Sequence, residues 1–100
     1  MLYIFEFLDE VYNDIQETKS WYSNQKDGLD DLFAQSVLNA ITAIDKMPAS
    51  YPVRYKNIRI AKTKIFPYHI HFYLEPTINK IVITAIVHNK RHQNISKNRQ

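Results

Sequence analysis

The fold is decided by residues 80–88, which read Lys80-Ile81-Val82-Ile83-Thr84-Ala85-Ile86-Val87-His88. This segment is almost wholly apolar, which predicts a strand buried on both sides near the centre of a sheet. Working outward, residues 65–75 predict a second strand, since side chains alternate between its two faces. One face would carry Phe66, Tyr68, Ile70, Phe72 and Leu74, and the other His69, His71 and Tyr73. Residues 75–79 predict the turn between these two strands.

Two more segments predict strands. Residues 57–63 form a candidate strand, and Tyr51-Pro52 before it is an extended or turn dipeptide. Residues 2–7 are β-branched and aromatic, and the segment is too short for a helix.

Helical spacing replaces this pattern from Asp9 to Lys26, where apolar side chains recur at three- and four-residue intervals, namely Val11, Ile15, Thr18 and Tyr22. Asp9 is placed to cap this helix, and Gly28, the only glycine, to end it in a left-handed conformation. A second helix is expected from Leu29 to Lys46, closed by Pro48. Its apolar stripe consists of Leu29, Phe33, Val37, Ala40, Ile41, Ile44 and Met47.

The expected fold class is α+β with the order β-α-α-β-β-β. The tight break between the helices favours an antiparallel helical hairpin, packed on one face of a mainly antiparallel sheet. Because the helices cover one face only, the other face should be wet or should bind something. We expect a single domain over residues 1–92 and a polar basic tail over residues 93–100.

Charge is divided unevenly along the chain. Residues 1–50 carry three lysines and nine acids, a net charge of −6, whereas residues 51–100 carry ten Lys or Arg and one acid, a net charge of +9. This asymmetry points to a polyanionic partner. The alternative is that acidic helices and basic strands neutralise each other within the domain.

Several classes of protein are disfavoured. The chain has no cysteine, its N-terminus is a poor secretion signal, and its apolar runs are too short to span a membrane. We therefore expect a cytoplasmic protein without a membrane partner. No glycine-rich phosphate loop, paired catalytic carboxylates or nucleophile–base motif suggests a metabolic enzyme, and no cofactor is expected.

The second half could support RNA cleavage, which needs a base, an acid and cations that hold the phosphate. His69, His71 or His88 could transfer protons, since histidine titrates near neutral pH. Arg59 and Arg91 could grip phosphate, and Tyr73 could stack on a base.

Structural alternatives stay open for these residues. His69 and His71 could be polar residues on a wet face, or a His-x-His metal pair, although no further ligand completes a set and no metal is expected. His88 and His92 could cap a strand end, and Arg59 could pair with Glu75 or a helix acid. The Trp21-Tyr22 pair is expected in the core of the hairpin rather than at an exposed contact site.

Five segments resemble, in order and spacing, the RelE/ParE superfamily of toxins. They are Gly28-Leu29-Asp30-Asp31-Leu32-Phe33, Ala40-Ile41-Thr42-Ala43-Ile44 before Pro48, Tyr51-Pro52 followed by Ile58-Arg59-Ile60-Ala61, Phe66-Pro67-Tyr68-His69-Ile70, and Ala85-Ile86-Val87-His88-Asn89-Lys90-Arg91. The resemblance covers nearly the whole chain and implies the toxin of a type II toxin–antitoxin (plasmid stabilisation) module. Such a toxin inhibits growth and is neutralised by a cognate antitoxin.

The resemblance implies one of two targets. RelE-like members cleave messenger RNA on the ribosome, and ParE-like members poison DNA gyrase; the long hairpin and the Phe-Pro-Tyr string look closer to ParE. Positions matching the ribonuclease pattern are Lys62 and Lys64, His69 where RelE often has arginine, and Arg91 after the last strand. The chain has no tyrosine beyond Tyr73, so the C-terminal tyrosine of that pattern is missing.

Two classes of function therefore remain. The first is a toxin that, if it is an enzyme, is an mRNA endoribonuclease, with catalytic candidates His69, His88 and Arg91. Its target-binding candidates are Arg59, Lys62, Lys64, His71, Tyr73 and Lys90. The second is a non-catalytic, degenerate family member that binds nucleic acid or protein. The implied assembly is a homodimer or a hetero-oligomer with the antitoxin.

Overall fold

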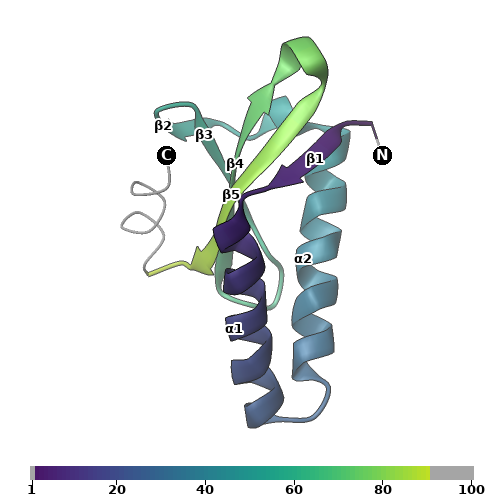
Figure 1. The fold of residues 1–100 in the computed structure, drawn as a ribbon, viewed down its shortest axis with the longest axis vertical. Coiled ribbons are helices and arrows are strands. Elements are labelled where there is room, and N and C mark those ends of the chain that lie inside the picture. Colours follow the sequence, from purple (N-terminus) through teal and green to yellow (C-terminus); the bar gives the residue numbers. More distant parts are fainter. Residues whose placement is uncertain (1, 91–100) are drawn as a thin grey trace.

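The structure is a computed structural model that describes residues 2–90. Two helices form one layer and a five-stranded sheet forms the other (Figure 1). In chain order the elements are β1 (Ile4–Phe7), α1 (Asp9–Gln25), α2 (Leu29–Lys46), the 3-10 turn η1 (Pro48–Ser50), β2 (Val53–Tyr55), β3 (Ile58–Lys62), β4 (Tyr68–Glu75), the 3-10 turn η2 (Pro76–Ile78) and β5 (Lys80–His88). The α+β class and the predicted order are confirmed, with β2 added.

The strand order is β1-β5-β4-β3-β2. β1 pairs with β5 in parallel, and all the other pairs are antiparallel. Ile70 pairs with Ile86 and His71 with Ala85, but Phe72 pairs with Ile83, so Thr84 is an extra residue in β5. Such a bulge increases the local twist of the sheet.

The core lies between the helices and one sheet face. α1 and α2 run side by side, and the strands lie toward the ends of the helices that are away from their connecting loop (Figure 1). The predicted inward face of β4 is confirmed, since Phe66, Ile70 and Phe72 belong to the core cluster and Tyr68 and Leu74 pack against it. β5 is buried from Ile81 to Val87, as its apolar sequence predicts.

The N-terminus is fixed by a contact that the sequence did not suggest. The buried Asp45 carboxylate, at the end of α2, accepts hydrogen bonds from the Leu2 backbone N–H at 2.8 and 3.0 Å. It also accepts one from the Tyr3 backbone N–H at 2.8 Å. This contact anchors the entry to β1 on the far end of the hairpin.

Three local expectations are wrong. Leu8, not Asp9, is the N-cap of α1, and Asp9 is already helical. Met47 is 65% exposed, because the chain turns into η1 directly after Lys46 and carries this side chain off the apolar stripe. The expected set of strands also lacked β2, which follows the extended or turn dipeptide Tyr51-Pro52. By contrast, Gly28 adopts the expected left-handed conformation, with φ of 89°.

Candidate functional site

Lys62 and His69 are direct neighbours on the sheet. Lys62 of β3 pairs with His69 of β4, which in turn pairs with Val87 of β5. Paired residues of antiparallel strands project to the same side, and the next positions, Ala61 and Ile70, both lie in the core. Lys62 and His69 therefore project from the face away from the helices. The structure brings these two predicted residues together.

His71 does not lie on a wet face, so that expectation is wrong, and the burial of its side chain gives its predicted role in target contact no support. Its side chain is fully buried, and its Nδ1 lies 2.8 Å from the hydroxyl of Tyr55. The two rings are also in edge contact, with centroids 5.9 Å apart. Tyr55 belongs to β2, a strand that was not expected, so the burial of His71 could not be predicted from its position in β4.

The centre of the helix-free face is also closed. Val82, Ala85 and Val87 project from it and are at most 3% exposed. Tyr73, which pairs with Val82, is half-buried on the same face. The expectation of a wet face therefore fails at its centre.

The two catalytic histidine candidates lie on opposite faces of the sheet. His88 pairs with Tyr68, whose ring packs on the helix side, with ring centroids 5.5 Å apart. His88 Nδ1 accepts a hydrogen bond from the Lys90 backbone N–H at 3.2 Å, so this imidazole caps the end of β5, as one alternative expected. His69, one position along β4 from Tyr68, faces away. Arg91 and His92 lie outside the described residues.

Arg59 has a structural contact. Its Nη1 donates hydrogen bonds to the carbonyl oxygens of Tyr51, at 2.5 Å, and Ala49, at 3.3 Å. It thus joins β3 to the chain around η1, and the expected pairing with Glu75 or a helix acid is wrong. The reason lies in η1, where the turn after Pro48 brings two carbonyl groups to the guanidinium.

Four cations remain exposed along one side of the sheet. We call Arg54, Lys56, Lys62 and Lys64 the basic edge; they lie on β2, on β3 and in the turns beside them. Between residues that the structure describes, the one ion pair joins Lys80 to Glu6. The hydrogen bond that Lys80 Nζ donates to the Glu6 carboxylate raises the pKa of Lys80. The carboxylates of the described residues therefore form no ion pair with the four cations of the basic edge.

The loop after β3 presents an aliphatic side chain to solvent. Ile65 is 90% exposed and has φ of 77°, a conformation that β-branched residues rarely adopt. The loop is held by Ser36 Oγ, which donates to the Lys64 carbonyl at 2.6 Å, and by Thr63 Oγ1, which donates to the Phe66 carbonyl at 2.8 Å. Together with α2 it encloses a groove of about 580 Å³, which we call the α2 groove; its walls include Leu32, Ala40, Tyr51, Lys62, Lys64 and Ile65.

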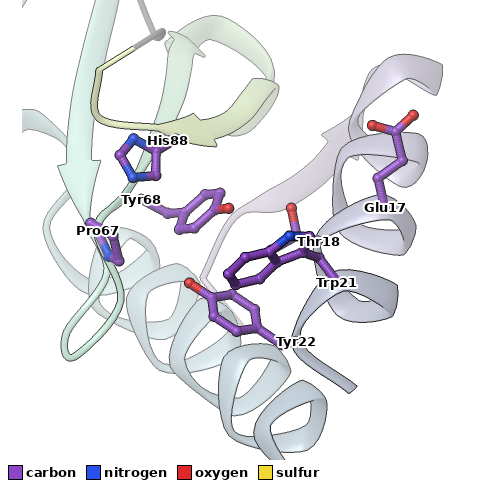
Figure 2. Close-up of a pocket in the computed structure, with 7 residues that line it drawn as sticks. All are labelled: Glu17, Thr18, Trp21, Tyr22, Pro67, Tyr68 and His88. Atoms are coloured by element: carbon purple, nitrogen blue, oxygen red, sulfur yellow. The ribbon is translucent and has the colours of Figure 1, made fainter. Parts of the chain in front are cut away.

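A second groove, of about 710 Å³, lies between α1 and the ends of β4 and β5 (Figure 2). We call it the aromatic groove; it is lined by Glu17, Thr18, Trp21, Tyr22, Pro67, Tyr68 and His88. The expectation that Trp21 lies in the hairpin core is wrong, because its side chain is 58% exposed. Tyr22, one residue on, is half-buried as expected; burial, and then the adjacent Tyr68, raise its pKa above the ordinary 10.0.

A metal-binding cluster and a membrane-spanning helix are both absent from residues 2–90. No group of three or more His, Cys, Asp or Glu side chains there is placed to hold a metal ion. No helix in that range is both long and apolar enough to cross a bilayer.

Comparison with known proteins adds information on the fold. No model of a known protein family matches this chain, and no curated protein matches it. Among solved structures, the chain is similar to one from a chromosomal ParDE TA system of P. aeruginosa, with a TM-score of 0.71 and 13% identity, over 87% of this chain and 96% of the other. At this identity the likeness establishes the fold alone. The protein therefore shares its fold with a chain from a ParDE TA system, in agreement with the resemblance stated from its sequence.

Proposed function

We propose that this chain is the toxin of a type II toxin–antitoxin module, held inactive by a cognate antitoxin. The observation that carries the proposal is the shared fold, which extends over 96% of a chain from a ParDE system. The exposed basic edge supports it, because a cationic surface favours a nucleic acid or a protein that handles one.

The antitoxin has a suitable binding surface in the α2 groove. Leu32 and Ile65 there are 57% and 90% exposed, beside the cations Lys62 and Lys64. Large apolar side chains exposed next to charges are typical of interaction sites. An antitoxin segment with apolar and acidic side chains would cover both the exposed apolar side chains and the two lysines.

For the target, we favour DNA gyrase over messenger RNA. Ribonucleolysis by paired acid and base needs both groups within reach of one phosphate. His69 and His88 project from opposite faces, and His71 is buried, so no two of these imidazoles share an open site. Direct mRNA cleavage remains the second candidate, supported by the adjacent Lys62 and His69.

Induced expression in bacteria without a partner gene tests the proposal. We expect growth arrest with a DNA-damage response and intact transcripts, because a gyrase poison leaves breaks in DNA. Fragmented transcripts that become intact in His69→Gln would replace gyrase with mRNA as the target. Normal growth at high soluble yield would reject the toxin function.

The remaining class of function is a non-catalytic binding module, which experiment can distinguish from a toxin. A module that binds nucleic acid through the basic edge alone would leave growth unaffected and would bind RNA or DNA with an affinity that falls steeply with salt. A salt-insensitive interaction would indicate a protein partner.

A further inference from the structure

The two outer strands of the described sheet differ in how they are protected against pairing with a further strand. β2, at one edge, has three residues, follows Pro52, carries the exposed Arg54 and has an irregular register between Val53 and Tyr55. Short length, proline, cations and bulges are the features that keep edge strands from pairing with other chains. β1, at the opposite edge, keeps a regular register with β5 over all four of its residues, and residues 2–8 include no proline, lysine or arginine. The β1 edge therefore lacks the protection that the β2 edge has.

Alternate backbone groups of β1 point away from β5. The N–H groups of Ile4 and Leu8 donate to carbonyl groups of β5 and of the residue before it, at 2.8 and 3.1 Å. In a parallel ladder the residues between them direct their N–H and C=O groups to the other side, and these residues are Tyr3, Phe5 and Phe7. The N–H of Tyr3 is held by the carboxylate near the end of α2. The donors on the outer edge are therefore the N–H groups of Phe5 and Phe7.

Apolar side chains flank this edge on both faces of the sheet. Ile4, on the helix-free face, and Leu2, just before the strand, are 65% and 70% exposed. On the helix face a row of rings follows the strand, with neighbouring centroids 6.4 and 6.0 Å apart; it consists of Phe5, Phe7 and Tyr12. Exposed apolar side chains gathered in this way mark an interaction surface.

We propose that β1 pairs with β1 of a second copy of this chain, so that the two sheets join across a twofold axis. Two identical antiparallel strands satisfy each other with the same backbone groups. Pairing centred on Phe5 uses the outward N–H groups of both copies and lays Ile4 of one copy beside Glu6 of the other. Pairing centred on Glu6 would set two carboxylates directly opposite each other, which is unfavourable. The expected register is therefore centred on Phe5.

Charge and size favour a second copy that binds weakly. Glu6 is the one charged residue of β1, and Lys80 of the same copy forms an ion pair with it. The edge therefore has no unbalanced charge to select a charged partner, whereas its backbone pattern is complementary to itself. Stable interfaces bury about 1,200–2,000 Å² in total, more than a four-residue strand and its flanking side chains provide, so the dimer should dissociate on dilution. This inference does not depend on the toxin assignment.

The mass of the full chain in solution tests the proposal. Sedimentation velocity from roughly 10 µM to 1 mM covers the range in which a weak complex forms. We expect the mass to rise from one chain to two, and the amide hydrogen exchange of Phe5 and Phe7 to slow over the same range, because their N–H groups become hydrogen-bonded. A mass of one chain at every concentration would overturn the proposal. A dimer in which these two amides exchange as fast as in the monomer would overturn it too.

Two variants with the same change in charge locate the interface. Ile4→Glu should weaken the dimer about tenfold or more, since each copy loses an apolar contact and gains a carboxylate beside Glu6 of the other copy. Val53→Glu makes this change at a 50% exposed position on the opposite edge strand and should leave the dimer unchanged. Equal weakening by both variants would mean that net charge governs association, and it would reject the β1 interface.

A third variant separates the loss of the interface from any loss of the fold. Ile4→Thr keeps a β-branched side chain, adds no charge and should still weaken the dimer about threefold, because less apolar surface is buried. Circular dichroism shows whether each variant is folded. A folded Ile4→Thr variant that dimerises as tightly as the native chain would contradict the role of this side chain at the interface.

Discussion

Asp45 is a buried carboxylate whose partners are all backbone N–H groups of the first residues. Replacing it with alanine would leave the N–H groups of Leu2 and Tyr3 without their acceptor. Hydrogen bonds to a charged group contribute about 1.5–3 kcal/mol each, so we expect the free energy of unfolding to fall by roughly 2–4 kcal/mol. Urea denaturation measures the loss. Asp45→Asn, which keeps one acceptor oxygen, should lose less, and an unchanged midpoint in Asp45→Ala would contradict the anchoring role.

Tyr22 should make the fold sensitive to alkaline pH. Burial, and then Tyr68, raise its pKa above 10.0, so the folded protein keeps this proton where the unfolded chain has lost it. The resulting stability is fully present below the ordinary pKa of tyrosine and is lost as pH rises through the raised value. Tyr22→Phe should therefore flatten the fall in unfolding midpoint above about pH 10. Tyr12→Phe, at a 57% exposed position, is the control, and identical pH profiles for native protein and Tyr22→Phe would refute the assignment.

For single side chains, sequence patterns predict the face of a strand or helix on which the side chain lies better than they predict how deeply it is buried. Alternation along β4 correctly separates Ile70 and Phe72 from His69 and His71. It cannot show that Tyr55 covers His71, because that contact depends on a three-residue strand with no pattern of its own. The same limit applies to Trp21, where helical spacing does not reveal that the indole is 58% exposed.

At the element scale, the helices are the most predictable part. α2 spans the expected Leu29–Lys46, and α1 ends one residue before the expected Lys26. A long apolar periodicity, bounded by Gly28 and Pro48, leaves few alternatives. β2 and the strand order were not predictable, since they arise from tertiary contacts such as that between Arg59 and the carbonyl of Tyr51.

The loop between β3 and β4 should gain stability from one substitution. A non-glycine residue in the left-handed region costs about 1–3 kcal/mol, and Ile65 adopts φ of 77° while burying little surface. Asparagine tolerates this conformation, so Ile65→Asn should raise the free energy of unfolding by about 1 kcal/mol. Ile78→Asn, also exposed but without positive φ, should give no gain in the same denaturation series. A loss of stability in Ile65→Asn would mean that contacts of the Ile65 side chain contribute more than the backbone strain costs.

At the scale of the whole molecule, the charge asymmetry of the sequence becomes a division in space. The acidic residues of the first half lie mainly on the two helices, whereas the exposed cations Arg54, Lys56, Lys62 and Lys64 follow the β2–β3 side. The two grooves reflect this division, since the α2 groove includes two lysines and the aromatic groove includes a glutamate. One small domain thus carries cationic and anionic side chains on different parts of its surface.

The basic edge should decide whether the protein acts on its target. Reversing the charges of Lys62 and Lys64, in a Lys62→Glu/Lys64→Glu variant, should abolish growth arrest on induction, because the surface proposed to contact the target would then carry the opposite charge. Both side chains are exposed, so the fold should persist, and circular dichroism and soluble yield would confirm this. The matched control, Lys26→Glu/Lys46→Glu, makes the same change in net charge on the exposed ends of the helices and should still arrest growth. If both variants lose activity together, overall charge governs toxicity, and if neither does, the target contacts another surface.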